Sequence, residues 1–340
     1  MSGNATQRYA NTAVLSVCGV DAPRVVTSAE LDEQLAVTYR RVGLRPGLLS
    51  NLAGITERRW WPDDVGFTDA AAMAGAKALA EAGVDPARVG LLVDTSVSRA
   101  HLEPSAACAV HHALELPTTC LNFDVANACL GFLNGMQLAA MMIDAGRIDY
   151  ALVVDGEGTR EIQENTLARL TRPDASRTDV LDQFATLTLG SGAAAMVLGR
   201  HDAHPEGHRL VGSVLRAATE HHTLCVGDLN AMTTDAKGLL DAGMAISGAM
   251  WADARGEFDW SDMDRYVAHQ VSQVHTAAMC KTLGIDPDRV PRSFPTRGNM
   301  GPASIPFTLA TQVDTLQPGD RVMLMGVGSG LNGCCTEVVW

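Results

Sequence analysis

The sequence predicts an α/β fold made of two similar halves, and two observations support this expectation. Short runs of buried-type apolar residues alternate along the chain with longer helical segments, as in proteins with parallel sheets. The spacing of features also repeats, because Cys129 precedes the apolar run around Val153 by nearly the distance that separates Asn299 from Leu324. A repeated order of this kind predicts two structural units of one pattern.

The predicted units are residues 1–200 and residues 201–340, with the polar stretch 201–208 as the connection between them. In a pair of such α/β units the carboxyl ends of the strands converge on one crevice. The residues that follow the strands in each unit are therefore the first candidates for a functional site.

Composition limits the classes of protein to be considered. The chain is 46% hydrophobic and 19% charged, which is typical of globular proteins. Its net charge of −13 argues against a nucleic-acid-binding surface, and no apolar run is long enough to span a membrane. The eight cysteines show no CxxC spacing, so we expect reduced thiols in a cytoplasmic protein.

The elements of the first unit follow from apolar runs and capping residues. Thr68 and Asp69 suit the N-cap of an Ala-rich helix. Segment 54–61 is predicted to be a turn that leads into an exposed aromatic stretch, and 159–182 to be polar and irregular. Strands are predicted at 12–20, 89–95, from 122, 150–154 and 194–198, and helices at 31–42, 68–83, 105–114 and 130–143.

The second unit repeats this order in a shorter form. Segment 293–299 is predicted to be a second strand-to-helix corner, and 326–330 to be a glycine-rich loop. Strands are predicted at 266–270 and 321–325, and helices at 271–283 and 303–313. If the strand ends converge, Cys129, His269, Asn299 and the glycine-rich loop meet in one crevice.

Cys129 is the strongest single candidate for chemistry. It lies at the predicted corner between a short strand and an apolar helix, where unpaired N–H groups and the helix dipole would favour a thiolate and could hold an oxyanion. A free cysteine is more often a small buried side chain, so this reading depends on the other residues.

Four motifs in order resemble the thiolase superfamily, in particular its ketoacyl synthase III branch. They are the segments 127–132 (Asn-Ala-Cys-Leu-Gly-Phe), 267–270 (Val-Ala-His-Gln), 298–304 (Gly-Asn-Met-Gly-Pro-Ala-Ser) and 326–330 (Gly-Val-Gly-Ser-Gly). The resemblance spans nearly the whole chain. It implies the thiolase fold, in which two similar α/β halves form a five-layered αβαβα sandwich.

Within that branch, segments 94–105 and 127–136 resemble the acyl-CoA:acyl-CoA condensing enzymes of the OleA type. In that group a glutamate ahead of the cysteine acts as the base in the partner subunit's active site. Glu103 stands at the corresponding place, followed by Pro104, which would help to fix the loop. The resemblance therefore implies a homodimer in which Glu103 acts in trans.

The resemblance implies a head-to-head Claisen condensation of two long-chain fatty acyl-CoA molecules without decarboxylation. Cys129 would take the first acyl group, and Glu103 would remove a proton from the α-carbon of the second acyl-CoA. His269 and Asn299 would donate to the enolate oxygen, and the N–H groups of Cys129 and of Gly328 or Ser329 would hold the oxyanion. The 2-alkyl-3-ketoacyl product would leave as a β-keto acid.

The expected mode of coenzyme A binding departs from the ketoacyl synthase III pattern. Leu48 and Leu52 occupy the positions of a tryptophan and an arginine that grip CoA in that branch. Arginines between Arg160 and Arg177, or Arg297, are the candidates that remain. The family needs no metal, no metal-ligand cluster is apparent in the sequence, and no cofactor is expected beyond the CoA thioester substrates.

Three other functions stay open at this point. A decarboxylative 3-oxoacyl-ACP synthase III would use acyl-CoA and malonyl-ACP and would need no glutamate base. A Cys/His/Asn hydrolase would release only free fatty acid, and a silent partner subunit would form no acyl adduct on Cys129. For the leading hypothesis, enzymes of an olefin or β-lactone pathway would be the downstream partners. The sequence does not indicate the acyl chain length.

Overall fold

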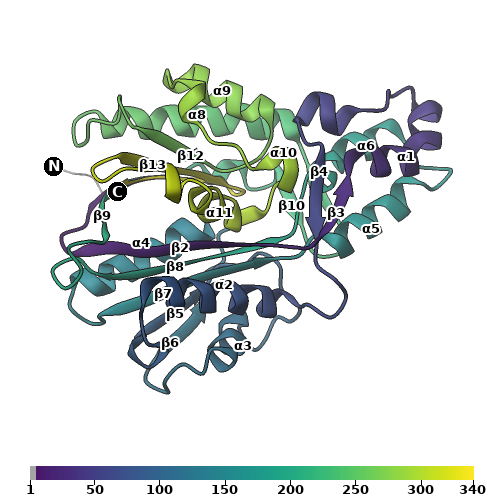
Figure 1. Ribbon diagram of the computed structural model, residues 1–340. Helices are drawn as coiled ribbons and strands as arrows, with labels where there is room; N and C mark the ends of the chain where they lie inside the picture. Colours follow the sequence, from purple (N-terminus) through teal and green to yellow (C-terminus); the bar gives the residue numbers. More distant parts are fainter. Residues whose placement is uncertain (1–4) are drawn as a thin grey trace.

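Two layers of strands, which belong to one ten-stranded sheet and are called here the first and the second sheet, lie between three layers of helices in the computed structural model, which describes residues 5–340 (Figure 1). Two further two-stranded sheets are formed by residues 24–27 with 57–60 and by residues 225–227 with 232–234. From one face to the other, the layers are α2 (Phe67–Ala82) with α3 (Ala106–Ala113), the first sheet, α4 (Gly131–Asp144) with α11 (Ser304–Ala310), the second sheet, and α8 (Ala236–Ala254) with α9 (Gln273–Leu283). The predicted five-layered αβαβα sandwich is thereby confirmed.

The first sheet has the strand order β2-β8-β7-β5-β6, and the second has the order β9-β14-β13-β12. A short antiparallel pairing between β2 and β9 joins the two sheets. The strands are β1 Thr6–Arg8, β2 Thr12–Asp21, β3 Arg24–Thr27, β4 Glu57–Trp60, β5 Leu91–Asp94, β6 Leu121–Asp124, β7 Tyr150–Glu157, β8 Gly192–Arg200, β9 His208–Ala217, β10 Cys225–Gly227, β11 Met232–Thr234, β12 Arg265–Ala268, β13 Arg321–Gly328 and β14 Asn332–Val339.

The two sheets repeat one pairing scheme. In the first, β5 runs parallel to β7, which pairs antiparallel with β8. In the second, β12 runs parallel to β13, which pairs antiparallel with β14. This repetition is the structural form of the repeat in the sequence, while the division at residue 200 stays a prediction.

The central layer holds the largest apolar core. Leu130, Phe132 and Leu133 at the start of α4 are each 1% exposed and pack with strands of both sheets. Burial of each such side chain contributes roughly 1.5–3 kcal/mol, so the helix that follows Cys129 is firmly fixed. The helices are α1 Ser28–Val42, α2 Phe67–Ala82, α3 Ala106–Ala113, α4 Gly131–Asp144, α5 Arg160–Leu170, α6 Arg177–Asp182, α7 Phe184–Leu187, α8 Ala236–Ala254, α9 Gln273–Leu283, α10 Phe294–Arg297 and α11 Ser304–Ala310.

Six short helical turns complete the secondary structure. One is a π-helical turn, η1 Leu49–Ala53, and the others are 3₁₀ turns: η2 Pro86–Arg88, η3 Thr219–His221, η4 Pro287–Arg289, η5 Gly301–Ala303 and η6 Val313–Thr315. None of the helices in residues 5–340 combines the length and the hydrophobicity that crossing a membrane would require.

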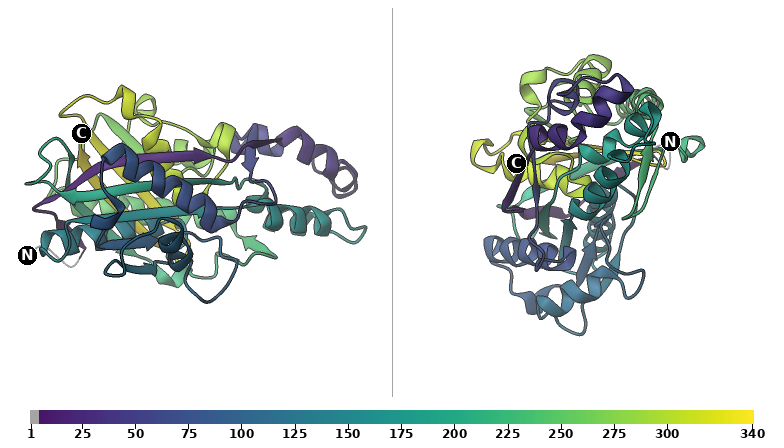
Figure 2. Two further views of the ribbon diagram at one scale, coloured as in Figure 1. Left: turned by 60° about the horizontal axis from the view of Figure 1, so that its bottom comes forward. Right: turned by 90° about the vertical axis from the view of Figure 1, so that its right-hand side faces the viewer.

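Helices α1, α5 and α6 form an extension at one end of the sandwich, beside strands β3 and β4. The left view of Figure 2 shows α1 and α5 side by side beyond the ends of the long strands. The prediction that 159–182 is irregular is wrong, because most of this stretch is helical. Its polar residues obscured the helix: Gln163 and Thr166 are fully buried, and the Gln163 amide accepts from Trp60 Nε1 and donates to the Thr186 carbonyl.

Two further predictions are wrong. Trp60 and Trp61 are buried rather than exposed, and each indole N–H has an internal acceptor. Segment 293–299, predicted to be a strand-to-helix corner, contains the short helix α10 (Phe294–Arg297) where the strand was expected. The N–H groups of Ser293 and Phe294 donate to the Gln270 side chain, so this backbone is satisfied outside a strand ladder.

Candidate active site

A cavity of about 1030 Å³ opens where strands of both sheets end, and it brings the predicted site residues together. Its lining includes Cys129, His269, Asn299, Gly328 and Ser329. These residues follow β6 and β12, precede α11, and occupy the end of β13. The predicted convergence of the strand ends therefore occurs in the structure.

The turn that carries Cys129 is tightly held. Ala128 has a positive φ of 44°, an uncommon value for a residue with a side chain, and the Leu130 N–H donates to the Asn127 carbonyl. The Asn127 side chain donates to Asn134 and accepts from Asn332. Contacts from both halves thus fix the cysteine just before α4.

Gly328 makes this junction of the two halves possible. A Cβ atom at this position would lie 2.8 Å from the Asn127 carbonyl oxygen and 3.1 Å from the Leu130 nitrogen. Only glycine allows the end of β13 to come so close to the cysteine turn. The backbone of Gly328 therefore lies next to the backbone that holds the thiol.

The prediction that the helix start lowers the pKa of Cys129 is wrong. Burial raises the pKa of this thiol to about 12, and the nearby Cys225, Glu157 and Asp155 add to the effect. Loss of solvation is the largest cause, because it disfavours the charged thiolate. The thiol is neutral at rest and must give up its proton when it attacks.

His269 lies directly after β12, where its N–H donates to the Met325 carbonyl. Burial lowers the pKa of its imidazole to about 4, and the neighbouring His275 acts in the same direction. His269 Nδ1 has no hydrogen-bond partner among the described residues. A neutral imidazole in this position can accept the thiol proton and can donate an N–H to a substrate oxygen.

Asn299 presents its amide to the cavity in a defined orientation. Its Oδ1 accepts from the Gly301 N–H at 3.0 Å, and its backbone N–H donates to the Thr188 carbonyl at 2.9 Å. Because Oδ1 is occupied, the Nδ2 group is the part of the amide available to a substrate oxygen.

Glu103 is placed differently from the other predicted site residues. His101 and Leu102 line the cavity, whereas Glu103 is exposed and lies outside the set of described residues that line it. Leu102 is 99% exposed. The loop thus lines the cavity up to Leu102, and Glu103 is not part of that lining.

Glu157, at the end of β7, is a buried cavity residue to which the sequence interpretation assigned no role. Its carboxylate accepts from the N–H groups of Val97 and Ser98 and from the Ser98 hydroxyl. Burial raises the pKa of Glu157 to about 7. The pair of acids at 155 and 157, closing a strand of apolar residues, was the available sequence signal for a buried acidic group.

The two arginines predicted to hold coenzyme A are already paired within the chain. Arg160 pairs with Asp63 and Glu164, and Arg297 pairs with Asp21. Neither is among the described residues that line the cavity. Their role in CoA binding stays a prediction.

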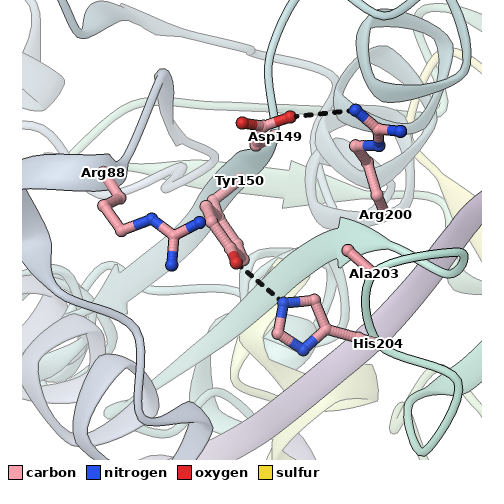
Figure 3. Close-up of a pocket in the computed structure, with 6 residues that line it drawn as sticks. All are labelled: Arg88, Asp149, Tyr150, Arg200, Ala203 and His204. Atoms are coloured by element: carbon pink, nitrogen blue, oxygen red, sulfur yellow. Dashed lines mark hydrogen bonds and ion pairs between the residues drawn. The ribbon is translucent and has the colours of Figure 1, made fainter.

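A second hollow, of about 220 Å³, lies at the opposite end of β7 (Figure 3). Its polar groups largely satisfy one another: Tyr150 Oη lies 2.7 Å from His204 Nε2, and Arg200 pairs with Asp149. Arg88 lies over the Tyr150 ring at 4.6 Å (Figure 3). These contacts tie the surface turns to β7. Within residues 5–340, no cluster of His, Cys, Asp or Glu side chains is suited to hold a metal ion.

Comparison with known proteins agrees with this fold. The family model for the 3-oxoacyl-acyl-carrier-protein (ACP) synthase III matches residues 123–219, and the model for the C-terminal part of that enzyme matches residues 254–340. Fold and site together define a thiolase-fold protein of the ketoacyl synthase III group.

More similar relatives narrow the assignment. The acyl-CoA:acyl-CoA alkyltransferase of Xanthomonas campestris pv. campestris is 45% identical over 98% of this chain and 99% of its own length. The acyl-CoA:acyl-CoA alkyltransferase of Shewanella oneidensis is 34% identical over 98% of this chain and its whole length. Crystal structures of Xanthomonas campestris OleA with bound lauric acid and lauroyl-CoA superpose with a TM-score of 0.96 at 44% identity, covering 98% of this chain and 100% of theirs. The chain belongs to the acyl-CoA:acyl-CoA alkyltransferase family.

Proposed function

We propose that this protein condenses two fatty acyl-CoA molecules head to head, without decarboxylation, through an acyl group carried on Cys129. The observation that carries the proposal is the large cavity in which a cysteine, a neutral histidine and an oriented asparagine amide meet. Apolar side chains, among them Met232, Met244 and Met279, form much of its wall, which suits alkyl chains.

In the first step the Cys129 sulfur attacks the thioester carbonyl and CoA leaves. His269 takes the thiol proton, because its imidazole is neutral and the thiol is not ionised at rest. That proton can then be delivered to the departing CoA thiolate. The acyl group ends as a thioester of Cys129.

In the second step a base removes a proton from the α-carbon of the second acyl-CoA. The imidazole of His269 and the Nδ2 group of Asn299 donate to the enolate oxygen, and the α-carbon attacks the acyl group on Cys129. The Cys129 thiolate leaves, and the product is a 2-alkyl-3-ketoacyl thioester. Hydrolysis of that thioester releases CoA and the β-keto acid.

We assign the base to Glu103, acting in the cavity of a second copy of the chain. Glu103 is exposed beside Leu102, which is 99% exposed, and β6 is the outer strand of the first sheet, with Leu121 54% and Phe123 37% exposed. An open strand edge with apolar side chains is a ready surface for pairing with a second copy. A homodimer through this edge would bring the loop of one copy toward the cavity of the other.

The test uses one acyl-CoA as the sole substrate. With myristoyl-CoA alone, purified protein should release two CoA molecules per molecule of β-keto acid, which mass spectrometry identifies. Turnover only when malonyl-ACP is added would favour the decarboxylative synthase instead. Free myristic acid as the sole product would identify a hydrolase.

A further inference from the structure

Helix α8 contributes one wall of the cavity. The side that faces the cavity carries Leu239, Gly243, Ser247 and Met250, spaced so that they share one face of the helix. At the inner end, Met250 and Cys335 are each 1% exposed and belong to the core between α8 and the second sheet. This branch of the cavity thus enters an apolar layer that could not accommodate a charged CoA head group.

Gly243 is the unusual member of this face. It is buried, yet a Cβ atom built on it would meet no heavy atom of the described residues within 4 Å. Glycine within a helix costs about 1 kcal/mol relative to alanine, and here no close contact requires it. The space that a side chain would fill is part of the cavity.

The hydroxyl group of Ser247, near Gly243, does not make this branch of the cavity polar. The Ser247 hydroxyl donates to the Gly243 carbonyl at 2.7 Å, so its hydrogen atom is used within the helix. Met244 and Met279 lie in the same lining, and methionine side chains adapt to flexible apolar ligands. The wall near Gly243 therefore suits a hydrocarbon chain.

We infer that Gly243 sets the length of acyl chain that the cavity accepts. The inference rests on the proposed function in that the ligand is a fatty acyl thioester. A chain attached to Cys129 and lying along α8 passes through the space left by the missing side chain. Any side chain at position 243 would take that space from the acyl chain and exclude the longer substrates first.

The experiment measures acylation of Cys129, because this step does not depend on condensation. A graded series, G243A, G243V and G243F, is incubated with octanoyl-, decanoyl-, myristoyl- and palmitoyl-CoA, and CoA release and the acyl adduct are followed by intact-protein mass. The ratio of the myristoyl-CoA to the octanoyl-CoA rate should fall in the order Ala, Val, Phe, by at least about 10-fold for Val or Phe. Octanoyl-CoA should remain a substrate.

The matched control is Ala245, an exposed residue two positions after Gly243 on the outer side of α8. A245V and A245F should leave the ratio unchanged. An unchanged ratio in folded G243V, or an equal loss of all four substrates, overturns the inference. If G243F does not fold, G243A and G243V still decide, since alanine favours the helix more than glycine does. Failure of condensation with chain-length selection intact would contradict the proposed function alone.

Discussion

The end of strand β7 and the loop that follows β5 lie side by side at the cavity, yet their glutamates are in opposite situations. Glu157 on β7 is 4% exposed and accepts hydrogen bonds from Val97 and Ser98 of the loop. Glu103 on the loop is exposed. The Glu157 carboxylate is therefore bound to the loop by hydrogen bonds, whereas the Glu103 carboxylate is exposed on the loop.

Under the proposed function, this difference implies that closeness to Cys129 does not by itself make a base. Glu157 lines the same cavity as the cysteine, but the groups of the loop occupy both of its oxygens. Glu103 is exposed. A base that must reach a substrate carbon needs a free carboxylate, and in the proposal Glu103 would enter a cavity by joining a second chain.

The largest expected effect on condensation comes from removing the exposed carboxylate of Glu103. E103Q should lower the rate of β-keto acid formation by roughly 10²–10⁴-fold while acylation of Cys129 by the first acyl-CoA continues. The check is product formation beside the intact-protein mass of the acyl adduct. E161Q, which changes an exposed glutamate on α5, serves as the control. Normal condensation by E103Q would assign the base elsewhere.

A smaller effect is expected from loosening the loop instead of removing its base. E157A takes away the acceptor for Val97 and Ser98, so condensation should slow by roughly 10- to 100-fold, because a base displaced by about 1 Å loses efficiency. Acylation of Cys129 should not slow, because Glu157 acts to raise the pKa of that thiol. Equal loss of both steps would mean that Glu157 serves the site in another way.

The same buried carboxyl should make stability depend on pH. Burial raises the pKa of Glu157 from its usual 4.5 to about 7, so the folded protein keeps a proton that the unfolded chain has lost in this range. The contribution of Glu157 to the free energy of unfolding is fully present below about pH 4.5, and it is lost as the pH rises through 7. The melting temperature should therefore fall between pH 5 and pH 8, and fall less in E157Q. An identical pH dependence in both proteins would contradict the buried state of Glu157.

The smallest expected effect is that of S98A, which removes one hydroxyl from the contact between loop and strand. Ser98 Oγ donates to Glu157 and accepts from the Gly158 N–H. The loss should lower the free energy of unfolding by about 1–2 kcal/mol, with condensation reduced less than in E157A. Denaturant unfolding at constant pH measures the first effect. A loss of condensation larger than that of E157A would reverse the order of the two contacts.

The sequence predicted that Cys129, His269 and Asn299 meet at one cavity, because each stands in a motif at a corner between secondary-structure elements. Cys129, His269 and Asn299 could be placed together from the repeat of strand, corner and helix alone. The low pKa expected for Cys129 failed because burial, which depends on residues far apart in the chain, outweighs the local effect of the helix.

Other features depend on contacts that no local pattern reveals. Helix α5 was hidden because Gln163 and Thr166 are buried polar residues, and the partners of Gln163 lie in distant segments. The role of Glu157 likewise depends on the path of the loop that carries Val97 and Ser98. Gly243 lies in α8, a helix that the sequence analysis did not predict, and the open space beside this glycine is known only from the structure.

The central claim is that Cys129 of one chain works with Glu103 of another, and mixed dimers test it most directly. A C129A chain and an E103Q chain, each inactive in condensation alone, are co-expressed with different affinity tags and purified as the heterodimer. If the glutamate acts across the dimer, one of the two cavities is complete and the heterodimer should condense myristoyl-CoA at about half the wild-type rate. A heterodimer without condensation activity would contradict the claim, because it would place both residues in the same chain's site.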